Sequence, residues 1–414
     1  MPRISLAKLG PGLLFAGCAV GVSHLVQSTR AGADFGWGLL WALLLINLFK
    51  YPFFQYGPRY ALSTGESLLD GYYRLGKGYL VLYFVLNIVM MFTVQAAVTV
   101  VTAGLAIQLF GGSSSIVLWC ILLIAFCSII LVLGKYKFLD GLIKVIMVVL
   151  AVCSVTAVVV AFVKGNASPD LTITQIMPKG SEVLFLLAFM GWMPAHMDGS
   201  VWYSMWAIEK SKNQKVTYKE SLFDFNVGYM ASVVLAVCFL ALGALVMFGS
   251  GEIFSSQGAA FAGQLINLYT STMGQVFFWL IAVAAFATML STTITCLDAS
   301  PRVMTRSVEL IAPKSTMVKR KNSDKKLYGI WMIILAIGTS IIFISFLSEM
   351  GTLVRIATVL SFISAPIYAT LNLAVVTSKH MPKERRPSKT LKLISILGIV
   401  FLLGFTGYFV STLF

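Results

Sequence analysis

Charged residues are the scarcest class in this sequence. Asp, Glu, Lys and Arg make up 11% of its 414 residues, whereas hydrophobic residues make up 58% and the mean hydropathy is +0.88. A soluble domain of this length does not carry so much apolar surface, so the composition excludes a soluble protein and predicts an integral membrane protein. Each membrane-crossing helix needs ~20 apolar residues, and the chain supplies about eleven such runs.

Histidine and cysteine are also few. The three histidines, His24, His196 and His380, cannot form a metal-hydrolase or nucleophile constellation, so we expect neither an enzyme nor a cofactor. All six cysteines lie inside apolar runs, which favours small core residues over a disulfide framework or a metal cluster. The stretch before the first apolar run is too short for a cleaved signal peptide, so none is expected.

The apolar runs predict an all-α membrane protein with eleven spans. They are placed at residues 11–34, 37–62, 79–109, 115–133, 139–163, 183–207, 223–249, 274–299, 328–347, 352–377 and 391–412. We expect one transmembrane transporter domain over 1–414. Its first repeat covers about 11–163, its second about 183–377 in the opposite orientation, and a last helix at about 391–412 is additional.

Positive charge is concentrated in alternate loops. With a cytoplasmic N-terminus, 24 Lys and Arg residues fall in cytoplasmic segments, against only Lys164 and Lys179 outside. Since Lys and Arg favour the cytoplasmic side, we predict a multi-pass plasma-membrane protein with its C-terminus outside the cell. This distribution explains the net charge of +15 without a nucleic-acid partner, and the expected partner is the lipid bilayer.

Two of the predicted spans are interrupted by glycine and polar residues. In the first, Leu13–Gly36, the interruption holds Gly17, Gly21, Ser23 and His24; in the sixth, it is the stretch Gly191–Ser200. A lipid-spanning helix unwinds only where it is buried in protein or lines a wet cavity. Paired broken spans in the two halves of a chain indicate the binding site of a secondary transporter. We therefore predict a transporter whose substrate lies between the two breaks.

Several short motifs resemble those of a known transporter family. They are Gly10-Pro11-Gly12, Gly32-Ala33, Leu39-Leu40-Trp41 and Thr64-Gly65 at unchanged spacing, and Met193-Pro194 in the sixth span. The stretch from Gly10 to Leu68 resembles the start of the Nramp (natural resistance-associated macrophage protein) family of divalent-metal transporters. The resemblance implies the leucine-transporter-like fold, an inverted five-plus-five repeat with broken helices 1 and 6.

The chain departs from that family where the family binds metal. The family's Asp-Pro-Gly-Asn motif corresponds here to Gly21–His24, its Met-Pro-His histidine to Ala195, and a second histidine to Ser200. The third span lacks the family's proton-linked glutamate. A dication leaving water needs oxygen or nitrogen donors and negative charge, and without them it is very costly at the membrane midplane. The sequence therefore resembles a divergent, Nramp-related bicarbonate transporter, with no transition-metal site expected.

The polar residues that remain at the breaks suit a small anion. His24 and Arg30 make the pocket neutral or positive, and the second half-helices point their N–H groups at it. A planar oxyanion such as bicarbonate fits this set in size and hydrogen bonding. The predicted substrate contacts are Gly21, Ser23, His24, Gln27, Thr29, Arg30, Met190, Trp192 and Met193.

Other interpretations of these residues stay open. His24 is either a substrate contact or a histidine packed between spans, and Met193 alone is weak evidence because methionine is common in apolar cores. Asp198 is paired with His196 or Arg30, carries protons, or lies in water at the end of its half-helix. Lys50 has no assigned role.

The eighth span carries a dense run of hydroxyl residues, Thr288–Thr295. In sodium-coupled carriers of this fold, such hydroxyls hold Na⁺ together with free carbonyls of the first break. The expected Na⁺ ligands are Gly17, Val20, Gly21, Ser291, Thr292 and Thr295. The alternative is that these hydroxyls only bond back to their own helix.

The leading hypothesis is Na⁺-coupled symport of a small anion, with bicarbonate as the best single candidate. One alternative is a divalent-metal carrier for Mn²⁺, Fe²⁺ or Mg²⁺ with an altered site. Another is a Na⁺-coupled carrier of a small organic solute. A channel or membrane sensor is disfavoured, because a channel does not need two broken helices and no cytoplasmic segment is long enough for a signalling domain.

Overall fold

A computed structural model describes residues 17, 19–111, 115–134, 136–165, 168–213, 217–252, 254–255, 258–312, 323–346 and 350–411. Over these residues the regular structure is entirely helical, which confirms the predicted all-α class. Six helices among them are long and apolar enough to cross a membrane: Lys77–Phe110, Tyr218–Met247, Gln275–Ile311, Lys325–Ser345, Gly351–Thr377 and Lys389–Ser411. Shorter apolar helices cover Ile116–Val132, Val148–Lys164 and Glu182–Trp192.

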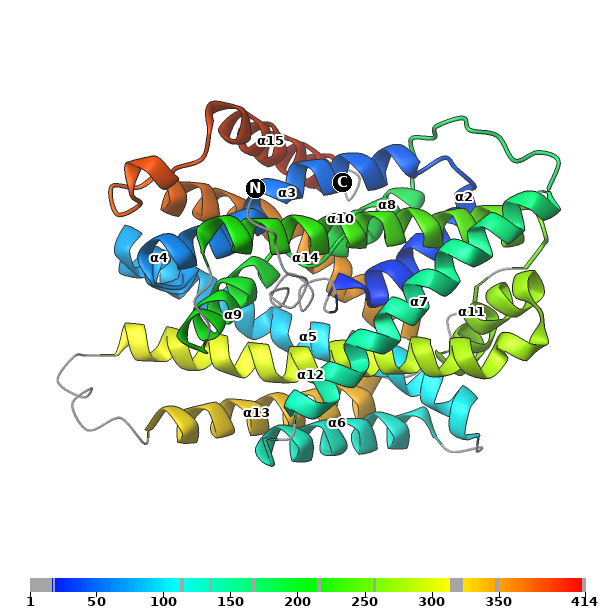
Figure 1. The fold of residues 1–414 in the computed structure, drawn as a ribbon, viewed down its shortest axis with the longest axis horizontal. Helices are drawn as coiled ribbons and strands as arrows, with labels where there is room; N and C mark the ends of the chain where they lie inside the picture. The colour runs from blue at the N-terminus through cyan, green and yellow to red at the C-terminus, as the bar shows by residue number, and fades with distance from the viewer. Residues whose placement is uncertain are drawn as a thin grey trace.

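The long helices form a bundle in which most run along the longest axis of the molecule, whereas the one over Tyr136–Lys164 crosses the view obliquely (Figure 1). They are α3 (Leu40–Thr64), α5 (Lys77–Phe110), α6 (Ile116–Val132), α7 (Tyr136–Lys164), α10 (Tyr218–Leu242), α12 (Phe278–Ile311), α13 (Ser323–Phe346), α14 (Met350–Thr377) and α15 (Lys389–Ser411). Each of these nine helices coincides with one predicted span. Two shorter helices, α4 (Leu68–Leu75) and α11 (Gly258–Met273), lie between spans.

The two remaining predicted spans are broken, as expected. In the first, the non-helical residues Val20 and Gly21 precede a π-helical segment, η2 (Ser23–Ser28), and the short helix α2 (Thr29–Phe35). In the sixth, α8 (Glu182–Trp192) and α9 (Gly199–Asn213) are separated by a non-helical stretch that contains Pro194, which has no backbone N–H to continue a helix. The residues before Gly17, including the Gly10-Pro11-Gly12 motif, lie outside the described part of the chain.

Glycine lets the broken first span approach its neighbours closely. A Cβ added to Gly32 in α2 would lie 1.9 Å from the carbonyl oxygen of Leu240, and one added to Gly243 would lie 2.1 Å from that of Thr29. Gly243 begins η3 (Gly243–Met247), the π-helical continuation of α10. Small residues at such crossings let two backbones touch, which is how membrane helices associate without a hydrophobic driving force. This close packing holds α2 against α10 and η3.

Candidate functional site

The two breaks touch each other at the centre of the bundle. The hydroxyl of buried Ser23 lies 3.2 Å from the carbonyl oxygen of Pro194 and 2.8 Å from that of Ala19. Ser23 begins η2 directly after the first break and Pro194 lies in the second, although they are far apart in the sequence. The predicted meeting of the two interruptions is therefore present in the structure.

A small central cavity lies at this junction. Its volume is about 20 Å³, and its described lining residues are Ala19, Val22, Ser23, Val98, Trp192, Ala195, His196, Thr292 and Cys296. A cavity of this size holds about one water molecule, so no larger solute fits at the centre in this conformation. Of the predicted substrate contacts, Ser23 and Trp192 line it. The indole N–H of Trp192 is buried and has no hydrogen-bond partner among the described residues.

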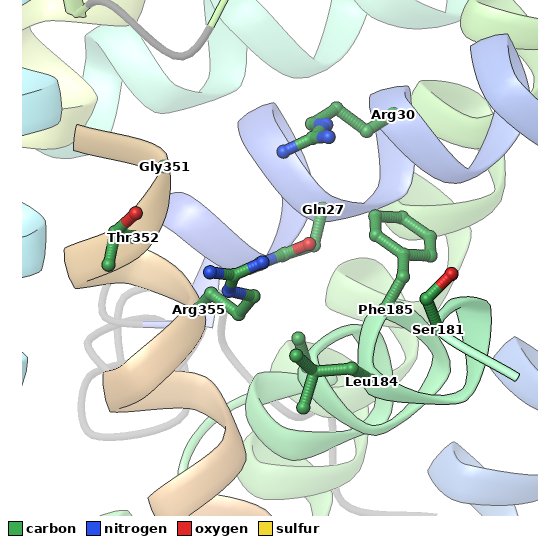
Figure 2. A pocket seen from close by; sticks show the side chains of 9 residues that line it. Gln27, Arg30, Ser181, Leu184, Phe185, Gly351, Thr352 and Arg355 are labelled. Atoms are coloured by element: carbon green, nitrogen blue, oxygen red, sulfur yellow. The ribbon is translucent and has the colours of Figure 1, made fainter. Parts of the chain in front are cut away.

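A larger polar pocket, the vestibule, lies where α2 meets the N-terminal ends of α8 and α14. Its volume is about 250 Å³, and the described residues that line it are Gln27, Arg30, Ser181, Leu184, Phe185, Ala188, Gly351, Thr352 and Arg355. Figure 2 shows Gln27 and Arg355 extending into the same part of the vestibule, with Arg30 on its other side. The predicted contacts Gln27 and Arg30 thus lie here, apart from the central cavity.

The vestibule is electropositive. Two of its described lining residues are arginines and none is acidic. The guanidinium of Arg30 lies 5.6 Å from the ring centre of Phe185 and 3.9 Å from the nearer carboxylate oxygen of Asp34, a long and partly exposed ion pair. The side chain of Arg355 is exposed. The N-terminal end of α14 adds the positive end of a helix dipole, whereas that of α8 carries Glu182 in its first turn. Arg355 was not among the predicted substrate contacts.

His24 is held by protein atoms on both sides of its ring. Its Nε2 atom lies 2.9 Å from the carbonyl oxygen of Ser232 in α10, and its Nδ1 atom lies 2.7 Å from the hydroxyl of Ser23. Because a carbonyl only accepts hydrogen bonds, Nε2 donates to Ser232. The ring is fully buried and lines neither the central cavity nor the vestibule. This geometry makes His24 a residue that positions Ser23, and its direct contact with substrate stays a prediction.

The other predicted substrate contacts lie around the central cavity without lining it. Gly21 and Thr29 are part of the first broken span, and Met190 and Met193 are fully buried at the second. The Met193–Pro194 peptide bond is cis. None of these four residues lines the central cavity or the vestibule, so their contact with substrate stays a prediction.

The hydroxyl run on α12 faces the first break. Thr292 Oγ1 donates to the carbonyl oxygen of Gly17 at 3.4 Å. A Cβ added to Gly21 would lie 3.1 Å from Thr292 Oγ1. Val20 is buried in the bend next to Gly21, and Ser291 and Thr295 are buried on either side of Thr292 along α12. The structure therefore brings Gly17, Gly21 and Thr292 together. Thr292 also bonds back to Thr288 O at 3.1 Å.

Asp198 forms a buried pair with His196. Its Oδ1 atom lies 2.6 Å from His196 Nδ1, and both side chains are almost inaccessible to solvent. The pairing with His196 is thus the one of the open interpretations that the structure supports. Among the described residues, no group of three or more His, Cys, Asp or Glu side chains is arranged to hold a metal ion.

Lys50 is the site residue that sequence reasoning left unassigned. Its ammonium group lies 2.8 Å from the carbonyl oxygen of Met190, 2.7 Å from that of Gly191 and 3.4 Å from that of Ala195. The side chain is fully buried. A lysine in the middle of an apolar span was the available signal, because such a charge requires a partner within the protein. The partner is the broken sixth span, which sequence alone does not place beside α3.

Comparison with known sequences finds relatives along almost the whole chain. The model of the family described as natural resistance-associated macrophage protein-like matches residues 12–412. An uncharacterised protein of Pasteurella multocida is 38% identical over 410 residues, which are 98% of this chain and 92% of that protein.

Solved structures with a similar fold include several transporters. A manganese transporter of Eremococcus coleocola has a TM-score of 0.70 at 15% identity, covering 97% of this chain and 85% of that one. MhsT in complex with L-phenylalanine has a TM-score of 0.63 at 16% identity, covering 96% and 98%. Mhp1, a nucleobase-cation-symport-1 family transporter, has a TM-score of 0.60 at 12% identity, covering 98% and 92%. At these identities the likeness concerns the fold, which is the predicted leucine-transporter-like one.

Proposed function

This chain belongs to the natural resistance-associated macrophage protein-like family of multi-pass membrane transporters, and we propose that it carries a small oxyanion by symport with Na⁺. Bicarbonate is the substrate that we consider first, because it is small, planar and rich in hydrogen-bond acceptors. The observation that carries the proposal is the vestibule, which Arg30 and Arg355 both line without an acidic residue among the described lining.

Arginine suits this substrate class better than a metal ion. A guanidinium presents a planar fork of N–H donors that matches a carboxylate-like or carbonate-like group, and it repels cations. The pocket is also large enough for a hydrated ion, whereas the central cavity is not. An anion attracted to the vestibule is thereby concentrated next to the closed centre, since clefts lined by one sign of charge focus the field on ions of the opposite sign.

The central cavity adds donors rather than negative charge. The free indole N–H of Trp192 and the hydroxyl of Ser23 lie at its wall. An oxyanion that entered as the cavity widened would accept from such donors, and a buried donor left unpaired costs free energy. The place of the family's metal-binding carboxylate is taken by Gly21, and His24 is engaged with Ser23 and Ser232.

Na⁺ has a candidate position next to the same cavity. The carbonyl oxygen of Gly17 and the hydroxyl of Thr292 face each other across the first break, where unwound carbonyls and a neighbouring hydroxyl form the oxygen-rich setting that Na⁺ needs. Thr292 also lines the central cavity. A Na⁺ at this position would offset the charge of an anion beside it, and its gradient would drive uptake.

The excess of Lys and Arg on one side of the membrane orients the proposed cycle. By the positive-inside rule, the vestibule faces the outside of the plasma membrane, so an external anion meets Arg30 and Arg355 first. The centre then opens to accept it together with Na⁺, and the two breaks close behind it before the cytoplasmic side opens.

Uptake by proteoliposomes tests the proposal directly. Purified protein is reconstituted, and accumulation of ¹⁴C-bicarbonate is measured with an inward Na⁺ gradient, with an equal K⁺ gradient and in protein-free liposomes. We expect accumulation only with Na⁺ and protein. Equal accumulation with K⁺ would refute the coupling ion, and no protein-dependent accumulation would refute the substrate. Quenching of an internal Mn²⁺-sensitive dye would support the metal-carrier alternative instead.

A further inference from the structure

The broken sixth span presents a group of oxygen atoms that would ordinarily attract a cation. α8 ends at Trp192, so the carbonyl groups of its last turn have no continuing helix to bond, and they form the negative end of its dipole. In broken-helix transporters, such half-helix C-termini and unwound carbonyls coordinate the transported or coupling cation. Here the carbonyl oxygens of Met190, Gly191 and Ala195 converge on one point.

That point is occupied by the side chain of Lys50. Its three hydrogen-bond contacts equal the three N–H donors of a charged ammonium group, whereas a neutral amine has only two N–H bonds to donate to these acceptor-only carbonyls. The contacts therefore fit the protonated form. The buried carboxylate of Asp198 lies within electrostatic range and supplies the opposite charge.

The ammonium group is held in place by packing as well as by hydrogen bonds. Lys50 belongs to the buried face of α3, and its side chain is fully enclosed. Gly191 is wedged against α14, because a Cβ added to it would lie 2.0 Å from the carbonyl oxygen of Thr358. Neither side of the contact has room to move away without repacking.

We propose that Lys50 is a specificity-determining residue: its tethered ammonium fills the cation position formed by Met190, Gly191 and Ala195, and so excludes metal ions from the sixth-span half of the site. A free cation at this position would have to displace a covalently attached one or lie against its charge. The inference rests on the proposed function only in that an ammonium group at this position, in place of a free cation, suits an anionic substrate. Cation exclusion itself holds for any substrate.

Removing the ammonium group should open the carbonyl cluster to free cations. Full-length wild-type, Lys50→Ala, Lys50→Met and Lys50→Arg proteins are purified in detergent. Mn²⁺ binding is then measured by the loss of the free-ion electron paramagnetic resonance signal, and Tl⁺ binding by equilibrium dialysis. We expect Lys50→Ala to bind Mn²⁺ or Tl⁺ at least tenfold more tightly than wild type, and Lys50→Arg to resemble wild type. Equal binding of both ions by wild type and folded Lys50→Ala would overturn the proposal.

A second variant keeps the proposal testable if Lys50→Ala folds poorly. Lys50→Met keeps the volume of the side-chain stem, so it is assayed for Mn²⁺ and Tl⁺ in the same way, and unchanged binding in a folded Lys50→Met protein counts equally against the proposal. Ethylammonium fits the space that Lys50→Ala opens but not that of Lys50→Met. We expect ethylammonium chloride, compared with NaCl at equal ionic strength, to raise the thermal midpoint of Lys50→Ala but not that of Lys50→Met. Equal effects on the two variants would argue against an ammonium-shaped site.

The outcome is separable from that of the bicarbonate experiment. Tighter cation binding by Lys50→Ala together with no bicarbonate uptake by wild type would keep the role of Lys50 and reject the substrate. Bicarbonate uptake by wild type together with unchanged cation binding by the variants would keep the substrate and reject the role of Lys50.

Discussion

The hydroxyl oxygen of Thr292 lies 3.4 Å from the carbonyl oxygen of Gly17, which joins the hydroxyl-rich helix α12 to the broken first span. Thr292 is buried, and Gly21 packs directly on its side chain. The same hydroxyl bonds back to the carbonyl oxygen of Thr288 at 3.1 Å, so it lies between its own helix and the interrupted backbone. This contact is the strongest structural support for a Na⁺ position at the first break.

We expect Thr292→Ala to weaken the dependence of transport on Na⁺. Loss of one of only a few Na⁺ ligands should raise the Na⁺ concentration for half-maximal uptake by about tenfold or more, taking the ligand oxygen to contribute as much as a hydrogen bond to a charged group, ~1.5–3 kcal/mol. The measurement is bicarbonate uptake against external Na⁺ at constant ionic strength.

Thr293 provides the matched control. It is the next residue of α12 and has the same side chain, but its hydroxyl lies 2.8 Å from that of Thr102 in α5, on a different face of the helix. Thr293→Ala should leave the Na⁺ dependence unchanged. If both variants shift the Na⁺ response equally, the effect comes from the general packing of α12 and the assignment of Thr292 is wrong.

Arg355→Gln should slow anion entry while leaving the fold intact. The side chain is exposed in the vestibule, so its removal lowers the local positive potential without opening a core cavity. We expect uptake at low substrate concentration to fall by about tenfold and to become less sensitive to salt, as for electrostatically steered association. Arg355→Lys should retain part of the uptake.

Lys179→Gln removes the same charge close to the vestibule but outside it. Lys179 is exposed and lies two residues before the lining residue Ser181. Its substitution should change uptake little. A loss equal to that of Arg355→Gln would mean that total surface charge, rather than the vestibule, sets the entry rate.

Trp192→Phe tests the central cavity. The substitution keeps an aromatic ring at the wall but removes the indole N–H, which has no partner among the described residues in this closed conformation. If this donor binds a charged substrate, its loss costs ~1.5–3 kcal/mol and raises KM by about tenfold or more. Trp279→Phe is the control, because Trp279 lies exposed on α12. A normal KM for Trp192→Phe would remove Trp192 from the substrate site.

Gly32→Ala should prevent α2 from seating against its neighbour. The added Cβ would lie 1.9 Å from the carbonyl oxygen of Leu240, and a backbone atom cannot move aside as a flexible side chain can. We expect a strongly reduced yield of monodisperse protein and a lower thermal midpoint in detergent. Gly404→Ala, in open space on α15, should be neutral or slightly stabilising because alanine favours a helix by ~1 kcal/mol.

The order of the membrane spans was predictable from the sequence because each span is a continuous run of apolar residues, which is read from residues adjacent in the chain. The interruption predicted at Gly191–Ser200 was predictable for the same reason, since Pro194 acts on its own stretch of backbone, although the non-helical part is shorter, 193–198. The helices along the described part of the chain agree with the predicted span order, and the gap between α8 and α9 confirms an interruption of the sixth span.

The partners of the polar residues were not predictable in this way. Lys50 contacts the sixth span, and Arg30 and Arg355 line one vestibule, only because helices distant in the sequence pack together. The predicted substrate set also divides in space: Ser23 and Trp192 line the central cavity, whereas Gln27 and Arg30 line the vestibule. Ser23, Gln27 and Arg30 are close in the sequence, but this closeness did not reveal which of the two cavities each side chain would line.

His24→Ala separates a positioning role from a substrate contact. The ring links η2 to α10 through Ser232 and holds the hydroxyl of Ser23, so its removal leaves a buried void and two lost hydrogen bonds. Large-to-small changes in a core cost ~2–5 kcal/mol, and we expect a thermal midpoint several degrees lower. Ser28→Ala, which removes only a 3.2 Å bond to Ser23 O in the same segment, should shift it much less. A His24→Ala protein that kept its thermal midpoint but lost uptake would instead place His24 in direct contact with the substrate.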